Sequence, residues 1–249
     1  MIPSSHPRYT SLKQRELLVK GFKAGATALE GLIAFGRGEA FDYLLGEKTP
    51  KAAFAALDAA ATQLLTAENP VLSVNGNTAV LCPEELVKLA DMLDAKLEIN
   101  LFHRTDERVK TIEKILKEHG AEKVYGVEPD VEIKGLESER RKVDRASIYS
   151  ADVVFVALED GDRTEALVGV GKKVVAVDLN PLSRTARTAT ITIVDNVVRA
   201  MPLLIQATEK LKMGDKRHLK NTYSPFDNKK NLEDSLSEMI DGLQGKDFH

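Results

Sequence analysis

The sequence predicts an α/β protein with a Rossmann-like, doubly wound core. Helices cover both faces of a mainly parallel sheet, and additional helices lie at the N- and C-termini. Short apolar runs alternate with helical patterns along the 249 residues, and several runs, such as Ala151–Leu158, are apolar without interruption. Such a run suits a strand with both faces buried, which favours a parallel sheet covered on both sides.

Strands of this sheet are predicted where apolar runs end at turn residues. They are expected at residues 70–74, 97–102, 123–125, 151–158, 173–179 and 190–194. Helical spacing predicts helices from Ser11 to about Glu30 and over residues 52–67, 83–93, 105–119 and 137–147. Gly36 and Gly38 bracket Arg37 and predict a loop that presents this arginine, and Asn75–Asn77 predicts a turn after the first strand.

The chain is expected to form one domain followed by an extension. Residues 1–212 are predicted to be a single α/β domain that includes the N-terminal helical segment. After Lys212 the chain becomes polar, and residues 213–249 are expected to form the C-terminal extension. Within it, Asn231–Leu243 has the pattern of an amphipathic helix. This helix is predicted to dock on the body of the protein or on a second subunit.

Composition narrows the partners and the location that we expect. The formal net charge is -3, so the chain has no basic field to coat a nucleic-acid backbone, and nucleic acid is not an expected partner. No run approaches the roughly 20 apolar residues that span a bilayer, and the N-terminus lacks the apolar stretch of a signal peptide. The single cysteine, Cys82, cannot form an intramolecular disulfide. We expect a cytoplasmic protein that does not contact a membrane.

Candidate ligand contacts follow the predicted strands, because ligands of open parallel sheets bind beyond the carboxyl ends of the strands. The segments at these positions are Asn75–Asn77, His103–Arg104, Glu159–Thr164, Asp178–Thr185 and Asp195–Asn196. Such residues also form ordinary turns and caps. Asp195 in particular suits the N-cap of the next helix, which would leave Asn196 with a free backbone N–H for a phosphate or a nucleobase.

Standard motifs exclude several kinds of chemistry. Gly36-Arg37-Gly38 is followed by Phe41 where a dinucleotide fingerprint needs glycine or alanine, and Gly171-Lys172 lacks the other residues of a P-loop. Hydride transfer and P-loop phosphoryl transfer therefore have little support. The sequence also contains no His-x-x-x-His pair for zinc and no serine elbow for triad chemistry.

The remaining candidates are charged residues in or near the predicted loops. Planar guanidinium groups bind phosphates and carboxylates, and this set comprises Arg15, Arg37, Arg104, Arg163 and Arg184. Asp160, Asp162 and Asp178 could hold Mg²⁺ or a ribose, or merely cap turns. His103 directly follows a strand and is a better acid–base candidate than His6 in the N-terminal segment.

Several long blocks of unusual composition carry a resemblance to a known family. They are Ile2–Tyr9, Gly31–Leu44, Val74–Asn77, Asn100–Thr105, Leu158–Leu167 and Asp178–Ala186. Together, up to about Leu211, they resemble the archaeal phosphopantothenate synthetases, also called 4-phosphopantoate–β-alanine ligases. The resemblance implies a homodimer with a Rossmann-like core that uses ATP and Mg²⁺. It also implies condensation of 4-phosphopantoate with β-alanine in coenzyme A biosynthesis, through an acyl adenylate, with release of AMP and diphosphate.

The resemblance implies roles for individual residues. The expected ATP contacts are Arg15, Arg37, Asp178, Leu179, Asn180, Ser183, Arg184, Thr185, Asn196 and Val197. The expected contacts to phosphopantoate are Asn75, Asn77, His103, Arg104 and Arg163. Catalysis is expected to involve His103, Arg104 and Asp162, and no residue is assigned as a direct ligand of Mg²⁺.

Two other functions stay compatible with these residues. A ligase of unphosphorylated pantoate would share the fold and the use of ATP, but it would not need arginines for a substrate phosphate. A non-catalytic nucleotide sensor on the same fold would bind ATP without turnover. Comparing pantoate with 4-phosphopantoate in an assay of AMP release distinguishes these alternatives.

Overall fold

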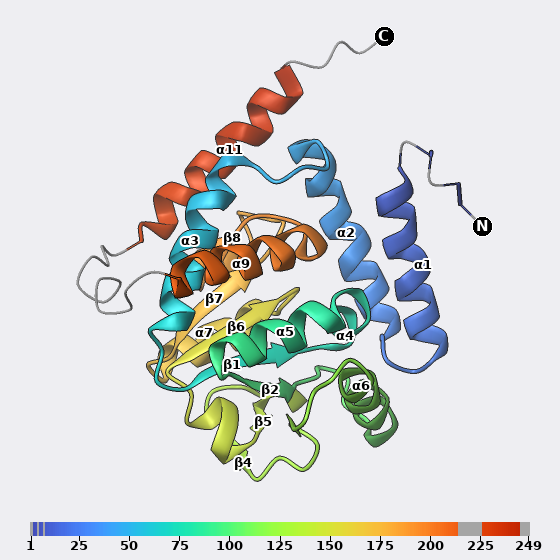
Figure 1. Ribbon diagram of the computed structural model, residues 1–249, viewed down its shortest axis with the longest axis vertical. Coiled ribbons are helices and arrows are strands. Elements are labelled where there is room, and N and C mark those ends of the chain that lie inside the picture. Colours follow the sequence, from blue (N-terminus) through green and yellow to red (C-terminus); the bar gives the residue numbers. More distant parts are fainter. Residues whose placement is uncertain (1, 4, 7, 214–225, 245–249) are drawn as a thin grey trace.

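Six parallel strands form the central sheet of the computed structural model, which describes residues 2–3, 5–6, 8–213 and 226–244 (Figure 1). Their order across the sheet is β3-β2-β1-β6-β7-β8. The strands are β1 (Pro70–Val74), β2 (Lys96–Ile99), β3 (Val124–Tyr125), β6 (Val153–Ala157), β7 (Lys173–Val177) and β8 (Ile191–Ile193). Each lies where the sequence predicts a strand, and the predicted α/β fold with a parallel sheet is confirmed.

The direction in which strands are added reverses between β1 and β6. From β1 the chain proceeds outwards to β2 and β3, and it then returns to place β6 on the other side of β1. The connections on the two sides of this point therefore diverge, and a crevice opens at the carboxyl ends of β1 and β6.

Helices cover both faces of the sheet. Side chains alternate between these faces along each strand. Leu72 and Val74 pack on one face against apolar side chains of α3, α5, α6 and α9, whereas Val71 and Val154 face the other side towards α7. These helices are α3 (Lys51–Leu65), α5 (Pro83–Leu93), α6 (Asp106–Glu118), α7 (Gly161–Gly169) and α9 (Val197–Lys212). The predicted bounds of α5 agree with those of the structure.

Two antiparallel strands pack on the face of the sheet that α7 covers. One of them lies within residues 137–147, where the sequence predicts a helix. This segment instead contains a 3₁₀ turn at Glu139–Arg141, strand β5 (Lys142–Val143) paired with β4 (Val131–Glu132), and a π turn at Arg145–Tyr149. The helix prediction is wrong because side chains far away in the sequence hold this backbone in another conformation. The Asn100 side chain at the end of β2 donates hydrogen bonds to the carbonyls of Arg140 and Lys142, both at 3.1 Å.

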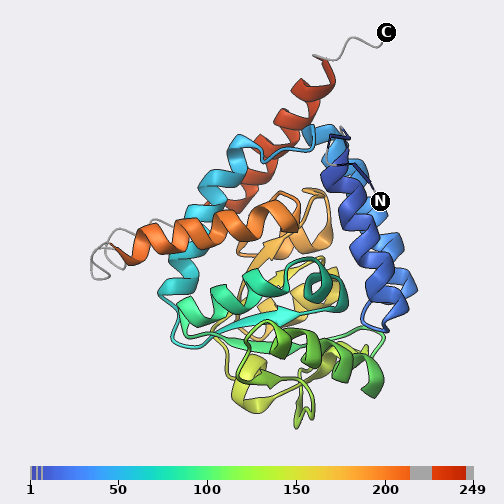
Figure 2. The ribbon, with the colours of Figure 1, turned by 45° about the vertical axis from the view of Figure 1, so that its right-hand side comes forward.

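The N-terminal region forms two helices, α1 (Tyr9–Lys23) and α2 (Leu29–Leu45), which lie side by side in Figures 1 and 2. The sequence predicts one helix up to about Glu30, but the chain turns at Gly25, whose φ is +84°. The predicted loop around Arg37 is also wrong, because Gly36 and Gly38 lie inside α2. Tertiary contacts outweigh the low helix propensity of glycine here.

The C-terminal helix α11 (Asn228–Gln244) packs against α2 and α3, as the amphipathic pattern of Asn231–Leu243 predicts (Figure 1). Both carboxylate oxygens of Glu238 accept hydrogen bonds at 2.8 Å from backbone N–H groups of Lys51 and Ala52, at the start of α3. The proposed division of the chain after residue 212 stays a prediction. Within the described residues, no helix combines the length and apolar character that crossing a bilayer requires.

A buried carboxylate in β2 links the sheet to the π turn. Glu98 is fully buried, and its carboxylate accepts hydrogen bonds from the N–H groups of Asp144 at 3.1 Å and Ile148 at 2.7 Å. Burial raises the pKa of Glu98 to about 7, although these hydrogen bonds oppose the shift. Folding thus favours the protonated form of Glu98.

We predict that Glu98 makes stability fall as the pH rises. Its pKa is higher in the folded than in the unfolded state, so its contribution is complete below about pH 4.5 and is lost as the pH rises through about 7. Relative to Glu98→Gln, the free energy of unfolding of the wild type should decrease by roughly 3 kcal/mol between pH 4.5 and pH 8. Denaturant unfolding at several pH values measures this. Glu122→Gln, at an exposed position, is the control, and equal pH slopes for both variants would contradict the prediction.

Candidate functional site

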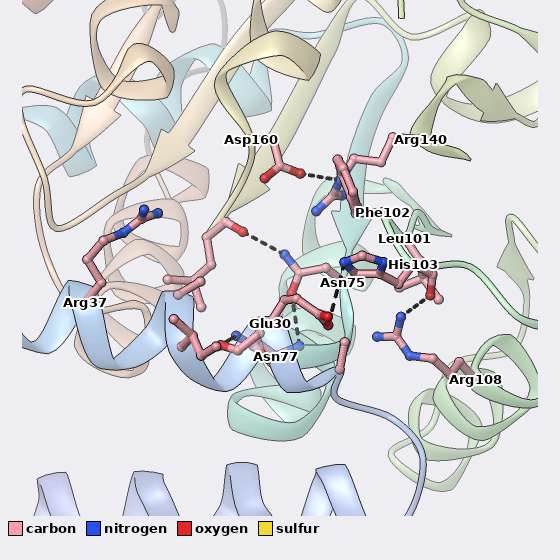
Figure 3. A pocket seen from close by; sticks show the side chains of 16 residues that line it. Glu30, Arg37, Asn75, Asn77, Leu101, Phe102, His103, Arg108, Arg140 and Asp160 are labelled. Carbon is pink, nitrogen blue, oxygen red and sulfur yellow. Dashed lines mark hydrogen bonds and ion pairs between the residues drawn. The ribbon is translucent and has the colours of Figure 1, made fainter. Parts of the chain in front are cut away.

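A pocket with a volume of about 320 Å³ lies at the point where the strand order reverses. Its walls come from α2, from the segments after β1, β2 and β6, from Arg108 on α6 and from Arg140 on the 3₁₀ turn (Figure 3). This is the position at which doubly wound sheets bind their ligands. Arg37, Asn75, Asn77 and His103 of the predicted site line it.

Asn75 builds the base of this pocket. The predicted turn after β1 is the start of α4 (Gly76–Leu81), and the Asn75 carboxamide oxygen accepts hydrogen bonds from the N–H groups of Asn77 and Thr78 at 3.1 and 3.0 Å. Its Nδ2 donates to the carbonyls of Ala157 at 2.7 Å and Leu158 at 3.2 Å. The side chain therefore joins the ends of β1 and β6 across the strand reversal, and it is engaged in these bonds rather than free.

Asn77 fixes α2 over the pocket. Its Nδ2 donates a hydrogen bond of 2.9 Å to the carbonyl of Gly31, near the start of α2. A Cβ atom at position 31 would lie 2.8 Å from the Asn77 Oδ1, so only glycine permits this approach without a shift. The Gly31-to-Asn77 contact thus explains one glycine of the conspicuous block that begins at Gly31.

Arg140 forms the charged wall beneath the pocket. Its side chain is 6% exposed, and its Nη1 lies 2.9 Å from Glu159 Oε1 while its Nε lies 2.7 Å from Asp160 Oδ2. Nη1 also donates to the carbonyl of Asn100 at 3.0 Å. The sequence does not single out Arg140, because it falls in the segment predicted as a polar helix, where an arginine gives no special signal.

Arg163 lies below this wall and does not line the pocket. It forms a buried ion pair with Glu159, and its side chain is only 1% exposed. Burial lowers the pKa of the Arg163 guanidinium, against the opposing charge of Glu159. The neighbouring Asp162 accepts the N–H of Arg163 at 2.9 Å in the first turn of α7, and it too lies outside the pocket lining.

The wall after β2 contains His103 and Arg108. His103 Nε2 lies 3.6 Å from Glu30 Oε2, and both side chains are well exposed at the rim. Arg108 donates from Nη2 to the carbonyl of Ala26 at 2.9 Å and from Nη1 to the carbonyl of His103. Arg104, in contrast, is directed elsewhere and donates to the carbonyl of Val127 at 2.8 Å.

The opposite end of the pocket contains Arg37 (Figure 3). Burial raises the pKa of the nearby Asp178 carboxyl, and the charge of Arg37 partly offsets this effect. Asp178 accepts hydrogen bonds from the N–H of Asn180 at 2.9 Å and from the Ser183 hydroxyl, so it organises the loop after β7. Leu179 is buried beneath α2.

Other residues of the predicted nucleotide set have partners of their own. Arg15 donates to both carboxylate oxygens of Glu39 at 3.0 Å, and Arg184 pairs with Glu165 at 2.6 Å. The Thr185 hydroxyl donates to the carbonyl of Glu159 at 2.9 Å. Like the Asp178 loop, these residues are not in the pocket lining.

The start of α9 corrects one prediction. Asn196 is the N-cap, because its side chain accepts the N–H of Val198 at 3.1 Å. Asp195 instead accepts the backbone N–H of Asn196 at 2.7 Å, so this N–H is not free for a phosphate or a nucleobase. Asn196 and Val197 are each 2% exposed.

The pocket also contains charged residues that the sequence does not single out, namely Glu30, Arg108 and Arg140. Asp160, which the sequence offers as a possible ligand of Mg²⁺ or a ribose because it follows a predicted strand, also lines the pocket. Glu30 and Arg108 lie inside helical patterns, where charged residues normally face solvent. Their inclusion depends on how α2 and α6 pack, which periodicity does not specify.

We predict that Asn75→Ala destabilises the protein by about 1 to 3 kcal/mol, because it removes both the helix cap and the bridge from β1 to β6. Asn75→Ser should lose less stability, since a serine hydroxyl can still cap α4 but cannot also bridge β1 to β6. Urea unfolding measures these differences. Asn69→Ala, at an exposed asparagine just before β1, serves as the control, and wild-type stability of Asn75→Ala would disprove the bridging role.

Comparison with known proteins assigns the chain to a family. A family model described as phosphopantothenate/pantothenate synthetase matches residues 52–242. The chain is 54% identical over 243 residues to a 4-phosphopantoate–β-alanine ligase of Thermococcus kodakarensis, covering 97% of this chain and 93% of the relative. It is 50% identical over 243 residues to the protein of that name from Methanosarcina mazei, covering 98% and 96%. The chain therefore belongs to the phosphopantothenate/pantothenate synthetase family.

Proposed function

We propose that the protein condenses 4-phosphopantoate with β-alanine at the expense of ATP, forming 4′-phosphopantothenate for coenzyme A biosynthesis. Near-full-length identity of 50–54% to relatives named for this reaction is the main support. The geometry agrees with it, because Arg37, Arg108 and Arg140 surround one pocket at the strand reversal. Guanidinium groups suit substrates that carry phosphates and carboxylates.

The proposed reaction has two steps. The carboxylate of phosphopantoate attacks the α-phosphorus of ATP, which forms an acyl adenylate and releases diphosphate. The amine of β-alanine, after losing a proton, then attacks the acyl carbon and displaces AMP. Both steps mainly require that reactants are positioned and that negative charge is neutralised.

We place ATP at the end of the pocket near Arg37 and the loop after β7. Arg37 lines the pocket and acts electrostatically on Asp178, whose loop contains Asn180 and Ser183. Arg15 and Arg184 are exposed, so they can exchange their carboxylate partners for phosphate. Thr185, Asn196 and Val197 are buried and could contribute only through the shape of this wall.

Mg²⁺ is proposed to accompany ATP, since it usually binds phosphate oxygens, water and one or two carboxylates. Among the described residues, no group of three or more His, Cys, Asp or Glu side chains is placed to hold a metal ion. Asp160 lines the pocket and is 43% exposed, so it is the carboxylate that would contact an ion held mainly by ATP. When bound, the ion would neutralise phosphate charge.

The amine step is proposed to use the rim of the pocket. His103 and Glu30 face each other at 3.6 Å and are accessible, so a β-alanine ammonium group can reach them. His103 would accept a proton, while Glu30 orients its ring. Arg104 and Asp162 lie outside the pocket lining and could only support this wall.

We also propose that the protein acts as a homodimer in the cytoplasm. Apolar side chains at the junction of α1 and α2 are exposed, with values of 43% for Val19, 43% for Phe22 and 55% for Leu29. A second copy covering this junction would remove them from water. The molar mass in solution, measured by light scattering, tests the dimer. A cytoplasmic location agrees with the proposed use of ATP. Cell fractionation tests this location.

We predict AMP formation from ATP that depends on both 4-phosphopantoate and β-alanine. Pantoate supplied in place of 4-phosphopantoate should give far less AMP, and omission of either substrate should give none above background. Chromatographic separation of nucleotides measures the product. Absence of AMP with all three substrates would refute the ligase function. Tight ATP binding without turnover would then favour the nucleotide sensor.

A second prediction separates the two steps by using Arg37→Ala and His103→Ala as mutual controls. Exchange of labelled diphosphate into ATP requires phosphopantoate but no β-alanine. Arg37→Ala should lower this exchange roughly 10-fold or more, because a charge-assisted contact to ATP is lost. His103→Ala should keep the exchange and slow AMP formation with β-alanine. Loss of exchange in His103→Ala would contradict the proposed role in the amine step.

A further inference from the structure

The C-terminal helix α11 packs against the segment that follows β7. It contacts α8 (Arg184–Thr188) and the edge strand β8 as well as α2 and α3 (Figure 1). α11 contributes Leu232 and Met239 to a buried apolar cluster. The same cluster contains Leu179 of the loop after β7 and Ala186 of α8. The loop that is proposed to contact ATP therefore packs on the C-terminal helix.

Asn228, the first residue of α11, connects α8 to β8. Its Nδ2 donates hydrogen bonds to the carbonyls of Ala186 at 2.9 Å and Ala189 at 3.0 Å, at the end of α8. Its Oδ1 accepts the N–H of Thr192 in β8 at 2.8 Å. Carbonyls at the end of a helix have no partner within that helix, and an edge strand leaves backbone groups unpaired. One side chain supplies partners for both.

Helix α8 depends on contacts at its two ends because it is only five residues long. A helix of this length is not stable by itself in water. At its start, the Ser183 hydroxyl accepts the N–H of Ala186 at 2.9 Å and donates to Asp178. At its end, Asn228 binds the carbonyls. A shift of α8 would therefore move Ser183 away from Asp178 and change the loop between them.

We propose that Asn228 is a positioning residue for ATP, because it fixes α8 and α8 holds the loop after β7 in the conformation that contacts the nucleotide. The proposal rests on the ligase function and on the ATP end of the pocket proposed above. Asn228 is not part of the pocket lining and acts through α8. A preformed loop loses little conformational freedom on binding, so ATP binds more tightly than it would to a loop that must first be ordered.

Asn228→Asp is the informative variant, because aspartate has nearly the same shape and keeps the acceptor for the N–H of Thr192. Its second oxygen would face the two carbonyls at the end of α8 and, in the ionised form, cannot donate to them. The new carboxylate lies in the first turn of α11, where the helix dipole favours a negative charge. The variant thus loosens α8 while α11 remains a helix.

Asn231→Asp is the matched control, one turn further along α11. Among the described residues, the Asn231 side chain makes one hydrogen bond, from Nδ2 to the carbonyl of Thr192 at 2.8 Å. The same exchange at this position weakens the contact of α11 with β8 but leaves the end of α8 untouched. Both variants should unfold at lower urea concentrations than the wild type. If Asn228→Asp does not fold, Asn228→Ser and Asn231→Ser form the second pair, since a serine hydroxyl can donate to only one carbonyl.

Asn228→Asp should raise the KM for ATP about 5- to 10-fold, the effect of losing a hydrogen bond. The KM for 4-phosphopantoate and the kcat should stay close to their wild-type values. Asn231→Asp should keep the wild-type KM for ATP at a temperature at which both variants are folded. Amide hydrogen exchange of residues 183–189 should be faster in Asn228→Asp than in Asn231→Asp.

Other outcomes would overturn the proposal. Equal KM values for ATP in the two variants would mean that Asn228 contributes only to stability. Faster exchange with an unchanged KM for ATP would mean that the loop ordered by Asn228 does not hold the nucleotide. Calorimetric titration with ATP alone separates this proposal from the ligase function. If no AMP is formed, weaker ATP binding by Asn228→Asp than by Asn231→Asp still supports the positioning role, whereas equal binding, or no ATP binding by the wild type, rejects it.

Discussion

The hydrogen bonds of the Asn75 side chain across the strand reversal are the constraint on which the site depends. Parallel strands that are added in opposite directions leave their connections diverging at the carboxyl edge. Asn75 caps α4 and simultaneously donates to the carbonyls of Ala157 and Leu158, so β1 and β6 end at a defined separation. Leu158 adopts a left-handed backbone with φ of +52°, which directs the following Glu159 and Asp160 into the charged wall.

Helix α2 converts this open crevice into a pocket. It crosses from the start of α4, where Asn77 donates to the Gly31 carbonyl, to the start of α9, where Asp42 accepts hydrogen bonds from Asn196 and Arg199. Each end is therefore fixed by polar groups that are buried or half-buried. Such groups have to be paired, so a displaced α2 would be penalised at both ends. The same helix brings Arg37 and Glu30 to the pocket, and its position connects folding to the proposed chemistry.

Arginine side chains stand at both ends of the pocket, with Arg37 near Asp178 at one end and Arg140 at the other. A ligase of this kind must hold two highly charged reactants without allowing their phosphates to repel each other. In the proposed reaction, arginines at separate ends of the pocket would meet this need.

Apolar periodicity and the residues that follow strands are local signals. They are sufficient to predict the α/β class, the positions of the strands and the C-terminal helix. They also make Arg37, Asn75, Asn77 and His103 candidates for the site. Tertiary structure alone decided that residues 29–45 form a helix, that residues 137–147 do not, and that Arg140 reaches the pocket. The tertiary structure also shows that the N–H of Asn196 donates a hydrogen bond to Asp195. These features depend on hydrogen bonds and ion pairs between residues far apart in the chain. No local pattern specifies which distant partner a polar group will find.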